Sequence, residues 1–169
     1  MITNLAPTLV LITALGLLGG WARTFHQQRI PKDTLISLRR TICYGRCPDY
    51  RVTITADGTV TFEGYKYVKA SGTVQSKITP EQVQQLISEV QKANYFALKN
   101  NYVRKEDGCP EVWTDNPSAI TEIKINGKKK SITHYHGCEE NRGTSIYPKA
   151  LTELENKIDE IADTKQWIR

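Results

Sequence analysis

Two histidines and a cysteine alternate along one short run of the chain, HYHGC. Residues at positions i, i+2 and i+4 of a β-strand share one face, so His134, His136 and Cys138 are expected to project from the same side. Imidazole nitrogen and thiolate sulfur are ligands that suit zinc and copper. One interpretation is therefore a zinc or copper site, with Cys43 and Cys47 of the run CYGRC completing the ligand shell.

A structural interpretation of the two histidines competes with the metal site. The same strand face carries Ile132, so the histidines would continue a partly buried sheet face. They would then bond to backbone groups or to carboxylates such as Asp49 or Glu111, and a disulfide at Cys138 would remove one ligand. We therefore expect no cofactor and no catalytic residue, and we keep zinc or copper as the alternative.

The sequence contains four cysteines, and they follow an uncharged apolar leader. An even number of cysteines behind an export segment indicates disulfides formed in an oxidising compartment. Sequence separation favours a local pair, Cys43 with Cys47, and a second pair, Cys109 with Cys138, at the open end of a hairpin. On the loop-entropy description these two bonds would stabilise the domain by about 2 and about 3–4 kcal/mol. Sequence alone does not choose among the three pairings that four cysteines allow.

A thiol oxidoreductase would use Cys43 or Cys47 as its nucleophile. Such enzymes usually carry Cys-x-x-Cys at a helix start, where the helix dipole lowers the thiol pKa. Here the spacing is longer and the expected context is strand, turn, strand. The sequence also contains no glycine-rich phosphate loop, no HExxH and no EF-hand loop. We therefore lean toward a non-enzymatic protein.

The first 22 residues carry no charged side chain. They are expected to form a signal peptide or an N-terminal membrane anchor, which places the rest in the periplasm, the cell envelope or outside the cell. Basic residues directly after this stretch would also allow an anchor that keeps the domain in the cytoplasm. Residues 23–33 form a linker, and residues 34–169 form a single domain. Because the net charge of +5 is spread over scattered lysines and arginines, nucleic-acid binding is not expected.

The domain begins with an antiparallel meander. Apolar and polar residues alternate from Tyr50 to Thr55 and again after Asp57-Gly58, a period of two that is typical of strands. A bulged loop at the turn sets Ile54 opposite Val60 and Val52 opposite Phe62, which keeps the apolar face intact. Residues 35–42 and 73–78 can add further strands.

Two helices and a second hairpin complete the pattern. Thr79-Pro80-Glu81-Gln82 predicts a capping box, and Asn126-Gly127 predicts a type I′ turn. The apolar stripes are Val83, Leu86, Ile87 and Val90 in the first helix, and Leu151, Leu154, Ile158 and Ile161 in the second. The fold class is α+β: an antiparallel sheet of two hairpin or meander units with two amphipathic helices packed on one face, in the order β-β-β-α-β-β-α.

Several aromatic residues could line a binding face, because tyrosine and tryptophan dominate interaction hot spots. Ordinary edge-strand packing is the alternative explanation. The candidates are Tyr50, Tyr65, Tyr67, Tyr95, Tyr102 and Trp113.

The runs CYGRCPDY and ADGTVTFEG resemble a bacterial family of exported domains of unknown function with the signature Cys-x-Gly-x-Cys-Pro-x-Tyr. Its longer members are similar also at Cys109, at Trp113-Thr114-Asp115 and at the run HYHGC. The resemblance covers about residues 33–168. It implies an exported or membrane-tethered α+β domain and brings no catalytic residues with it.

The leading hypothesis is an exported, disulfide-stabilised binding module of the cell envelope, without enzymatic activity. It would bind an unknown protein or envelope component through its sheet face or the loop at residues 99–118, and it would touch the membrane only through its N-terminal segment. A metal-binding domain is the alternative, and a thiol oxidoreductase is less favoured.

Overall fold

The computed structural model describes residues 29–140 and 145–168. The expected leader at residues 1–22, and the linker up to residue 28, lie outside the described residues. Within the described ranges, no helix has the length and apolar character needed to cross a membrane.

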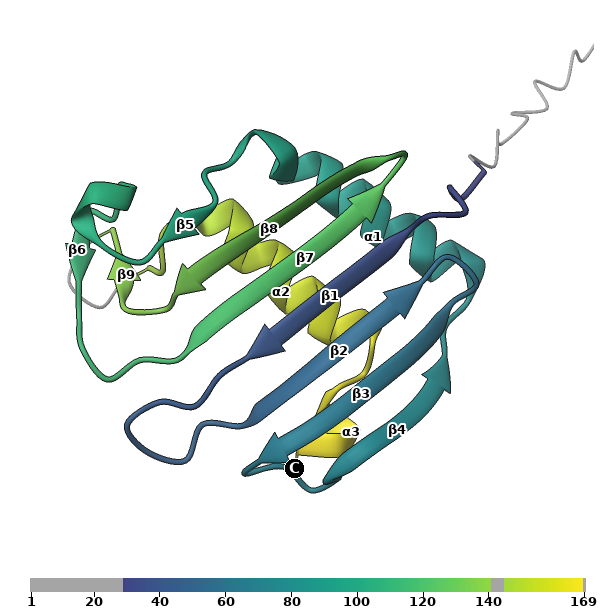
Figure 1. The fold of residues 1–169 in the computed structure, drawn as a ribbon, viewed down its shortest axis with the longest axis horizontal. Coiled ribbons are helices and arrows are strands. Elements are labelled where there is room, and N and C mark those ends of the chain that lie inside the picture. The colour runs from purple at the N-terminus through teal and green to yellow at the C-terminus, as the bar shows by residue number, and fades with distance from the viewer. Residues whose placement is uncertain (1–28, 141–144, 169) are drawn as a thin grey trace, which may run out of the picture.

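A seven-stranded sheet forms the body of the domain (Figure 1). Its spatial order is β4-β3-β2-β1-β7-β8-β5. Of these strands, only β5 is parallel to its neighbour, β8. The strands of the sheet are β1 (Leu35–Arg40), β2 (Asp49–Thr55), β3 (Thr59–Lys66), β4 (Gly72–Lys77), β5 (Asn101–Tyr102), β7 (Ser118–Ile125) and β8 (Lys128–Tyr135). A separate two-stranded ribbon joins β6 (Glu111–Val112) to β9 (Cys138–Glu139).

The predicted register between β2 and β3 is confirmed. Ile54 lies opposite Val60, and Val52 lies opposite Phe62. Gly58 closes the turn with a φ of 77°, in the left-handed region, where a side chain would be strained. A Cβ atom at this position would also lie 2.3 Å from the carbonyl oxygen of Ile78, so glycine is required there.

Strand β1 joins the two halves of the sheet. Leu38 pairs with Val52 on one side and with Thr121 on the other, and its side chain is fully buried. The α+β class and the order strands, helix, strands, helix are confirmed. The structure adds the short strands β5, β6 and β9, which lie in or beside the segment expected to be a loop.

Both long helices cover one face of the sheet (Figure 1). Helix α1 (Pro80–Lys92) begins with the predicted capping box between Thr79 and Gln82, and α2 (Lys149–Ile161) packs beside it. The short helix α3 (Lys165–Ile168) places the ring of Trp167 4.9 Å from the ring of Phe62. Two 3₁₀ turns, η1 (Tyr95–Ala97) and η2 (Lys105–Asp107), lie in the long connection after α1.

Candidate functional site

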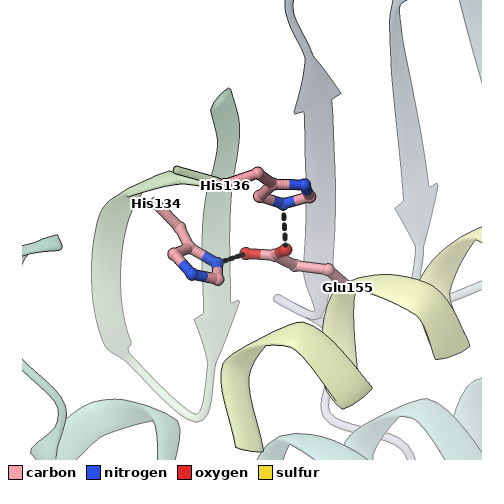
Figure 2. Close-up of side chains that lie close together, drawn as sticks. All are labelled: His134, His136 and Glu155. Carbon is pink, nitrogen blue, oxygen red and sulfur yellow. Dashed lines mark hydrogen bonds and ion pairs between the residues drawn. The ribbon is translucent and has the colours of Figure 1, made fainter. Parts of the chain in front are cut away.

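Two histidines and a glutamate meet between the sheet and α2 (Figure 2). His134 lies near the end of β8, and its Nδ1 atom is 2.8 Å from Oε1 of Glu155 on α2. His136, just beyond β8, places Nε2 3.0 Å from Oε2 of the same carboxylate. His134 and Glu155 are fully buried, whereas the His136 side chain is 13% exposed. One carboxylate therefore bridges two imidazoles, and we call these three residues the His–Glu–His cluster.

Glu155 was not anticipated from the sequence. Asp49, one of the two carboxylates considered, forms an ion pair with Arg39 instead, and Glu111 lies in β6, which pairs with β9. The available signal was the position of Glu155, directly after Leu154 and four residues after Leu151, inside the apolar stripe of α2. A charged residue on a buried helix face needs a partner of opposite charge, and that requirement points toward the histidine strand.

An arginine and an aspartate extend the cluster toward the helix surface. Arg40, the last residue of β1, places Nε and Nη2 3.1 and 3.0 Å from Oδ2 of Asp159. Its Nη1 atom lies 3.6 Å from Oε2 of Glu155 and 3.1 Å from Nε2 of His136. Tyr50 of β2 donates its hydroxyl proton to Asp159 at 2.8 Å. Side chains from three strands are thus tied to one helix.

The partners of His134 fix the orientation of its ring. Its Nε2 atom lies 3.0 Å from the carbonyl oxygen of Tyr147, which accepts hydrogen bonds and cannot donate. Nε2 therefore carries a proton. Its Nδ1 atom faces a carboxylate oxygen of Glu155 at 2.8 Å. The charge of Arg40 faces the carboxylates of Glu155 and Asp159, at 3.6 and 3.0 Å.

Burial and charge act in opposite directions on the ionisable groups of the cluster. Burial raises the pKa of Glu155, but hydrogen bonds from His134 and His136 and the charge of Arg40 outweigh it, so the pKa lies below its usual value. Burial lowers the pKa of Arg40, but Asp159 and Glu155 raise it by more. Both groups are therefore charged at neutral pH.

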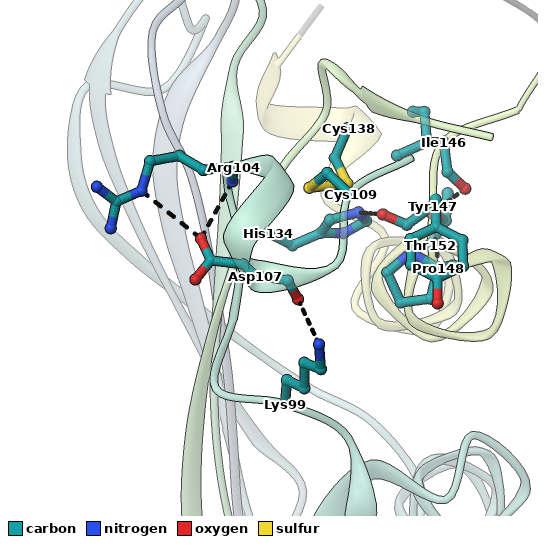
Figure 3. Close-up of a disulfide and its surroundings, with 10 residues drawn as sticks. All are labelled: Lys99, Arg104, Asp107, Cys109, His134, Cys138, Ile146, Tyr147, Pro148 and Thr152. Carbon is teal, nitrogen blue, oxygen red and sulfur yellow. Dashed lines mark hydrogen bonds and ion pairs between the residues drawn. A yellow bond between two sulfur atoms is a disulfide. The ribbon is translucent and has the colours of Figure 1, made fainter. Parts of the chain in front are cut away.

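The four cysteines form two disulfides, Cys43–Cys47 and Cys109–Cys138, the pairs that sequence separation favoured. The second bond lies beside His134 and the segment that leads into α2 (Figure 3). There the amide of Tyr147 donates to the carbonyl oxygen of Cys138 at 2.7 Å. This disulfide therefore braces the backbone that supplies the Tyr147 carbonyl to the His–Glu–His cluster.

The disulfides exclude the ligand shell considered from the sequence. While both bonds are intact, Cys43, Cys47 and Cys138 have no thiolate to offer a metal ion. In the structure each of these sulfur atoms is bonded to another sulfur. Nor does the Cys43–Cys47 bond lie at a helix start; it closes a loop between β1 and β2.

Three of the aromatic residues considered for a binding face are buried in the structure. Tyr50, Tyr95 and Tyr102 lie in the core, because they sit on or next to the face that the helices cover. The Tyr95 hydroxyl bonds to Thr121, and burial raises the pKa of Tyr95 to about 12. The large apolar side chains that are exposed are Ile42, Tyr44, Tyr65, Tyr67, Val112 and Trp113.

These six exposed residues lie in or beside the connections at one end of the sheet, and we call them the loop-end surface. Strands β1 and β3 end there and β7 begins there (Figure 1). Contacts between the loops hold them together. The amide of Tyr44 donates to the carbonyl oxygen of Asp115 at 3.3 Å. The guanidinium of Arg46 lies 5.7 Å from the centre of the Tyr67 ring, and that of Arg39 lies 4.6 Å from the Tyr65 ring.

The fold and the two disulfides define a small cross-linked α+β domain. Residues 34–162 match the family described as a domain of unknown function, DUF6438, and the chain belongs to this family. The match spans both disulfides, the His–Glu–His cluster and the loop-end surface. No curated protein is similar enough to match the chain.

Proposed function

We propose that this protein is a non-catalytic binding module of the cell envelope, and that it binds a partner protein through the loop-end surface. One observation carries the proposal: the large apolar side chains exposed on the described residues lie in or directly beside three connections at one end of the sheet. Single exposed apolar residues are ordinary, but a group of them at one end of a domain marks an interaction site.

The composition of this surface supports a protein partner. Tyrosine, tryptophan and arginine are the residues that most often dominate binding energy at protein interfaces. Tyr44 is 88% exposed, although its backbone is held by Asp115. The ring is therefore presented to solvent on a fixed backbone, which reduces the entropy lost on binding.

The disulfides support an oxidising location. Cys43–Cys47 closes the loop that carries Tyr44, so it stiffens the binding surface itself. Such bonds persist in the periplasm and outside the cell and are rare in the cytosol. Export would also account for the apolar leader, for which a signal peptide or an anchor is expected.

Photo-crosslinking in the producing cell tests the binding surface. A benzoylphenylalanine placed at Tyr44 is expected to give a discrete crosslinked product, whose yield falls at least tenfold in Trp113→Ala, since losing one hot-spot residue costs about 2 kcal/mol or more. The Trp113 backbone amide bonds to Gly137, and this bond survives the substitution.

The control uses α1 on the helix side of the domain. Gln85 is exposed there, so crosslinker at Gln85 and the variant Gln85→Ala serve as matched controls. The proposal fails if crosslinker at Gln85 gives the same products as crosslinker at Tyr44. It fails also if Gln85→Ala and Trp113→Ala lower the yield equally.

A further inference from the structure

We propose that His134, His136 and Glu155 form a binding site for one divalent transition-metal ion, and we expect zinc. The site lies between β8 and α2, and the inference is independent of the loop-end surface. Two imidazole nitrogens and a carboxylate are a donor set that zinc accepts. The cysteines take no part, because both pairs are oxidised.

The distances fit ligands of a single ion. Zinc binds histidine nitrogen and carboxylate oxygen at about 2.0–2.2 Å, so two atoms bound to one tetrahedral ion lie about 3.3–3.6 Å apart. The carboxylate of Glu155 lies 2.8 Å from His134 and 3.0 Å from His136, which are hydrogen-bond distances, so the side chains would have to move slightly apart to admit an ion. One ligand atom from each of the three residues can be chosen so that all lie within 4.8 Å of one another. Small side-chain rotations would bring them around an ion.

The orientation of the His134 ring is already that of a metal ligand. Histidine ligands usually donate their second ring N–H to a carbonyl or carboxylate, which fixes the ring and leaves the other nitrogen for the metal. Nε2 of His134 makes such a bond with the carbonyl oxygen of Tyr147 at 3.0 Å. Nδ1, on the side of Glu155, is the atom that would bind.

Nε2 of His136 lies between an acceptor and a donor, and it cannot form hydrogen bonds with both. Its Nε2 atom lies 3.0 Å from Oε2 of Glu155, which requires a donor, and 3.1 Å from Nη1 of Arg40, which requires an acceptor. One imidazole nitrogen carries either a proton or a free lone pair. A metal ion between His136 and Glu155 would satisfy these two groups, because nitrogen and carboxylate both act as electron-pair donors toward it; the contact of Nε2 with Arg40 would then be lost.

Arg40 is the feature that opposes a cation here. Its charge is already paired, since Nε and Nη2 both bond to Oδ2 of Asp159. The contact of Nη1 with His136 can therefore be lost without leaving the guanidinium alone. Zinc would also displace any proton held between the imidazoles and Glu155, which offsets part of the added positive charge. Binding should therefore release protons.

Isothermal titration of the full, oxidised chain with zinc chloride tests the site, after removal of metals with a chelator. We expect one zinc ion per chain, and titrations in two buffers of different ionisation enthalpy should show proton release. His136→Gln should weaken binding at least tenfold, since one ligand is lost while the amide still bonds to Glu155.

Two controls separate a site from adventitious zinc. Glu153→Gln alters an exposed carboxylate on the same helix and should leave the affinity unchanged. Circular dichroism reports whether each variant is folded, and a cobalt titration of the unaltered chain gives an absorption signature that needs no variant. The proposal is overturned if the folded, unaltered chain binds no zinc up to millimolar concentration. It is overturned also if His136→Gln binds as tightly as the unaltered chain.

Discussion

Replacing Glu155 with glutamine is expected to lower the free energy of unfolding at neutral pH by about 3 kcal/mol. The substitution keeps the volume of the side chain and removes its charge. His134 and Arg40 are then left near a neutral amide inside the protein, and removing one partner of a buried ion pair is strongly destabilising. Urea unfolding of the metal-free, oxidised chain measures the loss.

Acid should abolish the difference in stability between the unaltered chain and Glu155→Gln. The direction of this pH dependence follows from the pKa of Glu155. In the folded chain that pKa lies below the usual value of 4.5. The stabilisation by the carboxylate is therefore complete above 4.5 and is lost as the pH falls toward the folded pKa. The unaltered chain and Glu155→Gln should converge in stability as the pH is lowered, because protonated glutamate and glutamine carry the same charge.

Glu153→Gln is the matched control for the charge effect. Glu153 lies on the same helix, is half exposed, and faces Lys149 at 3.7 Å. An exposed pair of this kind contributes about 0.5 kcal/mol or less. Equal effects of the two glutamine variants would contradict a structural charge at Glu155, as would a difference that does not shrink in acid.

Removing the Cys109–Cys138 bond with the double substitution Cys109→Ala, Cys138→Ala is expected to cost about 3–4 kcal/mol on the loop-entropy description. The bond closes a loop with a sequence separation of 29 residues. Both cysteines are buried, so alanine avoids placing a polar group in the core. Urea unfolding at a single pH gives the change in free energy.

The other disulfide provides the comparison. Cys43→Ala, Cys47→Ala opens a loop with a separation of four residues and should cost about 2 kcal/mol. If the first double variant were no less stable than the unaltered chain, the long disulfide would not brace the domain. An equal loss in both double variants would show that loop length does not set the stabilisation.

Much of the fold could be predicted because its signals are local. The capping box at Thr79 and the pairing of Ile54 with Val60 depend on residues close in the chain. Strand β5 could not be found in this way, because two residues pair with β8 through contacts far apart in sequence. Period-two alternation needs more residues than Asn101 and Tyr102 provide.

The candidate site also combines features that local sequence predicts with features that it does not. The shared position of His134 and His136 follows from strand geometry, but the third member of the cluster comes from a helix. Helix periodicity marks Leu151 and Ile158 as buried, and the same rule places Glu155 among them. Whether a tyrosine is exposed is set by tertiary packing, which is why Tyr50 and Tyr102 were misplaced.

Disulfide mapping of the protein from its native compartment is the most direct test of an exported, cross-linked binding module. Free thiols would be alkylated before lysis, and the protein digested without reduction for mass spectrometry. We predict no alkylated cysteine and two linked peptide pairs, Cys43 with Cys47 and Cys109 with Cys138. Recovery of all four cysteines as alkylated thiols would contradict the oxidised module and its placement outside the cytoplasm.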